Sequence, residues 1–189
     1  MFPEAGMSSD GVVSPWRAVV TETEIEAIFD EHVNLVVWRR HWDRLPDSSV
    51  FMDPPRRLMR AVSGDPVNPM QIVHALGRER PCALTADLAN LVELFAILTG
   101  TSEIGIRLET SAKQTCPKWH TDRVSLRLMT TYCGPGTEWL DGATVHRSAT
   151  GDVLLAKGEL WSCAPGACLH RSPDPLGVPR LLLTLDALE

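Results

Sequence analysis

The second half of the chain is a series of short apolar runs separated by turn residues, and this pattern constrains the fold more than any other feature of the sequence. Beyond Gly100, runs rich in Val, Leu, Thr and Trp recur roughly every eight to twelve residues. Such spacing is typical of a β-sandwich or a β-barrel, because each run has the length of one strand. We expect strands over residues 104–110, 119–123, 125–132, 138–140, 144–147, 152–156, 167–171 and 180–186.

The first half is expected to be partly helical. Apolar residues between Thr85 and Leu98 recur at helical spacing, and Gly100 supplies a C-terminal stop. Thr21 and Glu24 form a capping-box pattern, which indicates where a second helix begins. We therefore predict helices over 85–98 and 22–31, a buried strand over 34–38, and helical turns over 57–62 and 70–76.

The chain is expected to form one domain, because its 189 residues show no internal repeat and no low-complexity linker. Residues 1–14 are predicted to be a loose tail, 15–102 a helical and mixed support region, and 103–189 a β-sheet core. The predicted fold class is α+β, mainly β in the C-terminal half, and the expected strands are enough for a jelly roll.

Composition excludes several classes of function. A net charge of -6 argues against a general nucleic-acid binder, which needs a concentrated Lys and Arg surface, and we interpret Arg39-Arg40 and Arg56-Arg57 as solvated surface. No window approaches the roughly 20 apolar residues that span a bilayer, and the first residues lack a signal-peptide pattern, so we expect a cytoplasmic protein. The odd number of cysteines, 5, predicts free thiols.

A candidate metal site begins in the segment Cys116-Pro-Lys-Trp-His120-Thr-Asp122. Strand side chains alternate faces, so His120 and Asp122 are expected to point the same way. His170, in the apolar segment before the last strand, is the candidate for a second imidazole. Two histidines and one carboxylate on one face of an octahedron are the ligands that Fe(II) accepts in oxygenases, with positions left open.

A candidate acid-binding site follows in the last strand. Arg180 can meet a carboxylate with a bidentate, charge-assisted pair, as a 2-oxoglutarate cosubstrate would need. Thr184 lies four residues further on and so on the same strand face, where its hydroxyl could assist.

The ordered set of these residues resembles a known family. His120-x-Asp122, Arg127, Thr130, Tyr132, the turn Gly134-Pro-Gly-Thr137, Gly151-Asp152, His170, Pro173, Gly177 and Arg180 are similar to the pattern of iron(II)- and 2-oxoglutarate-dependent dioxygenases of the prolyl-hydroxylase-like branch. With Val36-Val-Trp-Arg-Arg40 and Trp119-His-Thr-Asp122, the whole chain also resembles a bacterial family of unknown function. The turn departs from the Gly-Gly-Glu-Thr that is usual among the dioxygenases.

The resemblance implies a double-stranded β-helix with iron(II) at His120, Asp122 and His170. It implies 2-oxoglutarate at Arg180, helped by Tyr132 and Thr184. The implied reaction is hydroxylation of an unidentified small molecule or peptide, with 2-oxoglutarate decarboxylated to succinate. No nucleic acid or membrane is expected as a partner.

Other interpretations stay open at this point. Cys116 and Cys168 could join the two histidines in a closed Cys2His2 zinc site of a non-catalytic or metal-sensing barrel. A metallohydrolase or isomerase could use the same fold, with Arg180 binding another acid. His146 is a rival ligand, for which we favour a supporting or surface role. Simple ion pairs, of Asp122 with Arg123 or of Arg180 with Asp174 or Asp186, would need no ligand at all.

Overall fold

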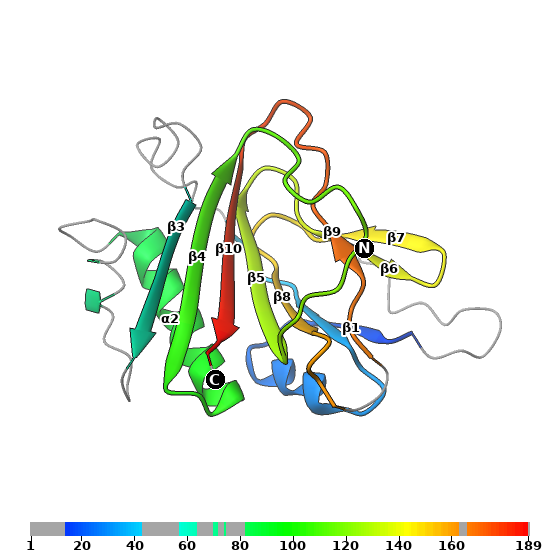
Figure 1. The fold of residues 1–189 in the computed structure, drawn as a ribbon, viewed down its shortest axis with the longest axis horizontal. Coiled ribbons are helices and arrows are strands. Elements are labelled where there is room, and N and C mark those ends of the chain that lie inside the picture. Colours follow the sequence, from blue (N-terminus) through cyan, green and yellow to red (C-terminus); the bar gives the residue numbers. More distant parts are fainter. Residues whose placement is uncertain are drawn as a thin grey trace.

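Two β-sheets dominate the computed structural model, which describes residues 14–42, 57–63, 70–71, 74, 82–162 and 166–188 (Figure 1). The seven-stranded sheet has the order β1-β2-β8-β5-β10-β4-β3, and the three-stranded sheet has the order β7-β6-β9. The elements are β1 (Trp16–Val19), η1 (Thr23–Phe29), β2 (Leu35–Trp38), β3 (Arg57–Ser63), α2 (Ala83–Thr99), β4 (Glu103–Ser111), β5 (Leu126–Cys133), β6 (Glu138–Asp141), β7 (Thr144–Arg147), β8 (Val153–Lys157), β9 (His170–Arg171) and β10 (Arg180–Ala187).

Strand alternation gives the large sheet two chemically different faces. On β10, Leu181, Leu183 and Leu185 are buried in the main core. This core lies between the large sheet and the helices α2 and η1, which pack against it. The alternate residues of β10, Arg180 and Thr184 among them, line a cavity on the opposite face. A second apolar cluster on that face, which includes Met129, Leu154 and Trp139, connects the large sheet to the small one. Two polar side chains of β10, those of Arg180 and Thr184, are therefore directed into one cavity.

α2 confirms the helix predicted over 85–98. Its buried residues recur at the expected spacing and face the large sheet: Leu84, Leu88, Leu91, Val92 and Phe95. The hydroxyl of Thr85 accepts a hydrogen bond from the backbone N–H of Cys82 at 2.7 Å, which satisfies a donor at the start of the helix. Gly100 ends the helix in the left-handed conformation with φ 66°.

The first half differs from its prediction in two segments. The segment 57–62, expected to be helical, belongs to β3, which pairs antiparallel with the edge of β4 from Arg57↔Glu109 to Ser63↔Glu103. The helix expected over 22–31 is the shorter 3₁₀ helix η1. Of the turn expected over 70–76, residues 70, 71 and 74 are helical and the others lie outside the described residues, as does almost all of the expected tail. The support region thus contributes strands as well as helices.

In the second half, most of the expected strands are confirmed within a residue or two at each end. The exceptions are 119–123 and 167–171. Only His120 of the first forms a bridge, and only His170–Arg171 of the second form a strand, because the two segments meet at a single pair of residues.

Two further findings bear on the class of protein. Among the described residues, no helix is both long and apolar enough to cross a lipid bilayer. The four cysteines in the described part of the chain, Cys82, Cys116, Cys133 and Cys168, form no disulfide bond with one another, in agreement with the prediction of thiols.

The turn after β5 depends on a close backbone approach at Gly136. A Cβ added there would overlap the carbonyl oxygen and hydroxyl of Ser148. We expect Gly136→Ala to lower the free energy of unfolding by about 3 kcal/mol, because backbone atoms would have to move. Gly142→Ala is the control, since Gly142 has φ 56° but open space around it, and should cost only about 1 kcal/mol. Urea unfolding measures both, and equal losses would contradict the packing argument.

Candidate metal centre

His120, Asp122 and His170 converge on one point, although about half of the predicted β core separates them in sequence. Their ligand atoms all lie within 4.8 Å of one another. Nε2 of His170 is 3.1 Å from Oδ2 of Asp122, and Nε2 of His120 is 3.9 Å from Oδ1. In the part of the chain that the structure describes, no other group of His, Cys, Asp or Glu could hold a metal ion. The three residues predicted from the sequence are therefore brought together.

Backbone pairing aligns the two histidines. The N–H of His120 donates to the carbonyl of His170 at 3.0 Å, and the N–H of His170 donates back to His120 at 3.0 Å. The two imidazole rings consequently lie side by side, with centroids 4.6 Å apart. On its other side, His170 pairs with Trp139 of β6, so this bridge extends the small sheet.

The hydrogen bonds of the ring nitrogens determine which nitrogen faces the cluster. Nδ1 of His120 is 3.0 Å from the carbonyl of Lys118, and Nδ1 of His170 is 3.1 Å from the carbonyl of Cys168. A carbonyl oxygen only accepts, so each Nδ1 carries a proton, and Nε2 is the nitrogen that would offer a lone pair to a metal ion. This is the arrangement in which histidine binds a metal ion.

Asp122 supplies the negative charge. Burial raises the pKa of its carboxyl group, but His170, Arg127 and His120 lower it more strongly, to about 2. Arg127 is charged at all relevant pH values, so the carboxylate is ionised at neutral pH whether or not the histidines are protonated. Oδ2 of Asp122 is buried and lies 3.1 Å from Nε2 of His170, but it forms no well-aligned hydrogen bond with a described residue. A buried, ionised oxygen that faces two imidazole nitrogens is a fit for a divalent cation.

Arg127 of β5 fixes the orientation of that carboxylate. Its Nη1 lies 2.5 Å from Oδ1 of Asp122, while Nε and Nη2 donate to the two carboxylate oxygens of Asp186 at 2.6 and 2.8 Å. One oxygen of Asp122 is thus engaged and the other faces the histidines. The sequence showed Arg127 in the family pattern but not this role, which follows from the pairing of Arg127 with Asp186 across β5 and β10.

Arg180 is a buried cation without a matching anion. Its side chain is 6% exposed and donates to the hydroxyls of Ser172, Thr131 and Thr137, at 3.2, 3.2 and 2.6 Å. Its Nε has no partner, and no carboxylate of the described residues forms an ion pair with it. Burial lowers its pKa to about 10, against the opposing effect of Glu109, so the guanidinium stays charged at neutral pH. A buried, charged guanidinium of this kind can bind the carboxylate of a ligand.

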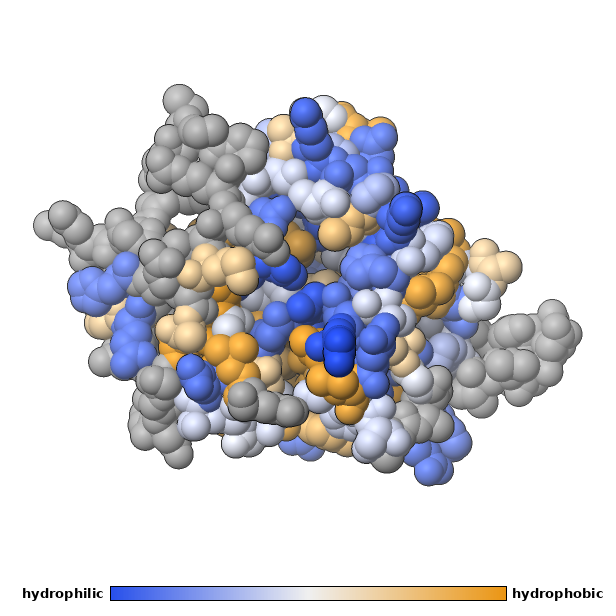
Figure 2. All heavy atoms as spheres, in the orientation of Figure 1, coloured by the Kyte–Doolittle hydropathy of each residue, from blue (hydrophilic) through white to orange (hydrophobic). Residues whose placement is uncertain are grey.

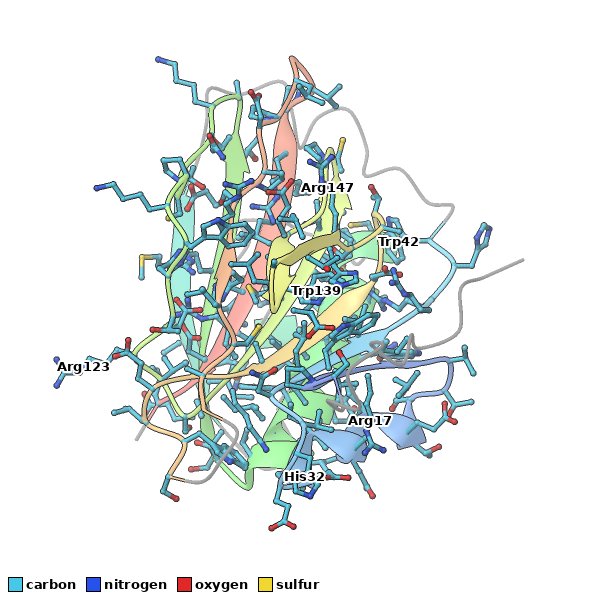
Figure 3. The ribbon with its side chains drawn as sticks, turned by 90° about the vertical axis from the view of Figure 1, so that its right-hand side faces the viewer. Arg17, His32, Trp42, Arg123, Trp139 and Arg147 are labelled. Atoms are coloured by element: carbon cyan, nitrogen blue, oxygen red, sulfur yellow. The ribbon has the colours of Figure 1, made fainter. Side chains whose placement is uncertain are left out.

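The ion pairs that would have explained these residues more simply are not formed. Asp186 pairs with Arg127, and Asp174 accepts a hydrogen bond from the backbone N–H of Leu176. Asp122 pairs with Arg127 rather than Arg123, whose side chain points away from the rest of the structure (Figure 3).

Arg180 and the two histidines open onto one cavity. Its volume is about 330 Å³. Figure 2 shows hydrophilic residues gathered over the middle of this face, among apolar ones. The lining residues come from both sheets and from the loops between them: Arg107, Glu109, Thr115, Cys116, His120, Arg127, Met129, Thr137, His170, Arg171, Ser172, Arg180, Leu182 and Thr184.

Of the two residues expected to assist Arg180, the structure brings only Thr184 to the cavity. Its hydroxyl accepts a hydrogen bond from Arg107 at 3.3 Å. Tyr132 faces the other side of the large sheet, where its hydroxyl donates to Asp87 of α2 at 2.7 Å. The expectation that Tyr132 helps to hold the cosubstrate is therefore not met. In β5, Arg127 and Met129 face the cavity, and Tyr132 has the opposite parity.

The alternative zinc site is not formed. Cys168 is buried in the smaller apolar cluster, and burial, followed by the charge of Asp122, raises its pKa to about 12, so it is a neutral thiol. Cys116 lines the cavity but does not join the three ligand atoms. His146, the rival ligand, does not belong to the metal-ligand cluster. Its ring instead stacks on Trp139, with centroids 5.4 Å apart and an interplanar angle of 17°.

Comparison with solved structures shows that the fold of this chain is shared with proteins that were solved as complexes with 2-oxoglutarate. Dioxygenase for auxin oxidation 1 from Arabidopsis thaliana, solved as a complex with 2-oxoglutarate, is 12% identical, with 92% of each chain covered and a TM-score of 0.58. A full-length protein of Neurospora crassa, solved with 2-oxoglutarate and 5-formyluracil, is 12% identical over 99% of this chain and 88% of its own, with a TM-score of 0.56.

The chain itself belongs to the family DUF1826, described as a protein of unknown function, whose model matches residues 21–186. No curated protein is similar enough in sequence to match it. The family description names no activity, so an activity can be inferred only from the residues of the site.

Removing the guanidinium of Arg127 would leave two carboxylates close together without their cation. We expect Arg127→Met to lower the free energy of unfolding by about 3 kcal/mol, measured by urea unfolding without added metal. Arg17→Met is the matched control, because Arg17 pairs with Asp30 at the surface, and should cost less than about 1 kcal/mol. Similar values for the two variants would show that the Arg127 bridge does not stabilise the fold.

Proposed function

We propose that this protein is an iron(II)- and 2-oxoglutarate-dependent oxygenase with a double-stranded β-helix core, which hydroxylates an unidentified small molecule or peptide. One observation carries the proposal: the guanidinium of Arg180 is buried, forms no ion pair with any described residue, and lines the same cavity as His120 and His170. A metal triad alone is compatible with many reactions. A triad together with a buried, unmatched cation fits a cosubstrate that has one end for the metal and a carboxylate at the other.

The residues fit both groups. Two imidazole lone pairs and one carboxylate oxygen are the ligands that suit Fe(II) in oxygenases. The guanidinium of Arg180 would hold the far carboxylate of 2-oxoglutarate, and the hydroxyls of Thr131, Thr137 and Ser172, which already contact the guanidinium, keep it in place.

Iron and 2-oxoglutarate, when bound, would allow O2 to act as the oxidant: one oxygen atom would enter succinate as 2-oxoglutarate loses carbon dioxide, and the other would enter the hydroxylated substrate. The protein's own share is orientation and exclusion of water. Arg127 restricts Asp122 to one free oxygen, and the backbone carbonyls of Lys118 and Cys168 fix the imidazole rings. Leu182 and Met129 contribute apolar surface to the cavity between the two ends.

The fold does not choose the primary substrate. The descriptions of the two similar structures name different molecules: auxin for the Arabidopsis enzyme and 5-formyluracil for the Neurospora protein. Both are small molecules, which is compatible with the size of the cavity here.

The test is release of succinate by the purified protein with Fe(II), ascorbate and 2-oxoglutarate, in the absence of any other substrate. We expect slow uncoupled turnover, and its loss in His170→Ala. Arg180→Met should raise the KM for 2-oxoglutarate roughly 100-fold, since it removes the charged partner of a buried carboxylate.

Tyr132→Phe is the control, because Tyr132 lies on the other side of the sheet and should leave this KM unchanged. Unchanged KM in Arg180→Met would contradict the proposed cosubstrate, and tight Zn²⁺ binding without succinate release would contradict the proposed activity.

A further inference from the structure

Arg171 occupies a special position beside the proposed metal centre. It follows the ligand His170 in β9 and lines the same cavity. Its guanidinium carbon lies 4.2 Å from the centroid of the Trp119 ring, and its Nε donates to Oε2 of Glu138 at 2.7 Å. Contact with an indole face on one side and with a carboxylate at one edge fixes the plane of the guanidinium.

The charge of Arg171 is only partly balanced. Glu138 is buried and also accepts hydrogen bonds from Nε and Nη2 of Arg147, the next cation along this sheet (Figure 3). Burial raises the pKa of Glu138, but the two arginines lower it more, so its carboxylate is charged. One negative charge therefore serves two guanidinium groups, and one positive charge is left over.

The outer nitrogens of Arg171 are available to a ligand. Neither Nη1 nor Nη2 forms a hydrogen bond with any residue that the structure describes. The side chain is 31% exposed, so a dissolved molecule can reach it, in contrast to Arg180 at 6%. The other cavity arginines near the metal have separate roles, because Arg127 is matched by two carboxylates and Arg180 is reserved for the cosubstrate.

The whole cavity wall favours an anion. Among the described lining residues there is one acid, Glu109, and there are four arginines. Arg127 is matched by Asp122 and Asp186, whereas Arg171 shares Glu138 with Arg147 and Arg180 forms no ion pair with a described residue. A wall of this charge attracts anionic molecules and raises their local concentration. A neutral substrate would gain little from the guanidinium of Arg171, which lies beside His170 in a fixed orientation and whose positive charge is only partly balanced.

We propose that Arg171 binds an oxyanion of the primary substrate, so that this substrate carries a carboxylate or a phosphate. The proposal deepens the proposed function and rests on it for the reaction, but not for the binding of the anion. Nη1 and Nη2 of Arg171 donate to the oxyanion, while Trp119 and Glu138 hold the guanidinium beside the metal centre.

The experiment measures binding of three probes of similar shape by calorimetry: benzoate, phenyl phosphate and neutral benzamide. The protein is loaded with Fe(II) and 2-oxoglutarate without oxygen, so that Arg180 is occupied. We expect wild-type protein to bind at least one of the two anions and to bind benzamide more weakly. Arg171→Met should weaken anion binding about tenfold or more, as expected for loss of hydrogen bonds from a charged donor.

Arg147→Met is the matched control. Arg147 pairs with the same Glu138 but does not line the cavity, so this variant loses no contact with the anion. It leaves Glu138 to balance Arg171 alone, so it should weaken anion binding, but clearly less than Arg171→Met does. Arg171→Lys, which keeps the charge, should lose less than Arg171→Met. Tighter binding of benzoate would indicate a carboxylate substrate, and tighter binding of phenyl phosphate would indicate a phosphate ester.

Three results would overturn the proposal: no anion binding by wild-type protein, benzamide binding as tight as that of the anions, or equal affinity in Arg171→Met and wild type. Failure of 2-oxoglutarate to bind would instead count against the proposed function. In that case the probes are titrated into Arg180→Met protein, where the same comparison of Arg171 with Arg147 decides.

Discussion

Two backbone hydrogen bonds between His120 and His170 place two of the three candidate metal ligands side by side. They join a loop after β4 to the short strand β9, and they are formed by the same residues whose side chains face the cluster. Backbone pairing is rigid and independent of the side chains, so the two imidazoles are held near each other before any ligand binds. Asp122 follows His120 by two residues and is therefore close to both rings, and its ion pair with Arg127 fixes the orientation of the carboxylate.

Because side chains alternate along each strand, one face of the large sheet forms the apolar core and the other face carries the residues of the candidate site. Its helix-facing residues are apolar and pack against α2, whereas its cavity-facing residues include Arg127, Arg180 and Thr184. Cavity-facing cations are costly to bury, and the structure compensates Arg127 with two aspartates while it leaves Arg180 with hydroxyls alone. This unequal treatment of two arginines in one cavity is the strongest sign that one of them awaits an acid.

Sequence alone predicted those parts of the site that depend on local spacing. The His-x-Asp pair, the histidine before the last strand and the arginine within it follow from residue types and strand periodicity, and α2 follows from helical periodicity and its terminal Gly100. β3 was missed because its stability comes from pairing with β4, which no local pattern encodes. Tyr132 was misassigned because its place in the family pattern was followed instead of its parity in β5.

Arg39-Arg40 shows the same limit, since a pair of arginines looks like solvated surface in a sequence. In the structure Arg40 forms a bidentate pair with Asp87 of α2 at 2.6 and 2.8 Å, and Arg39 pairs with the buried Asp152 at 2.6 Å. These partners are distant in sequence, so the interpretation as solvated surface was wrong for Arg40 and could be corrected only in three dimensions.

A crystal structure of the protein soaked with Fe(II) and 2-oxoglutarate without oxygen would show the metal ion and the cosubstrate in one experiment. We predict one metal ion bound by His120, Asp122 and His170, with 2-oxoglutarate bound to that ion at one end and its far carboxylate on the guanidinium of Arg180. A metal ion held by other residues, or a 2-oxoglutarate carboxylate bound away from Arg180, would contradict the proposed site.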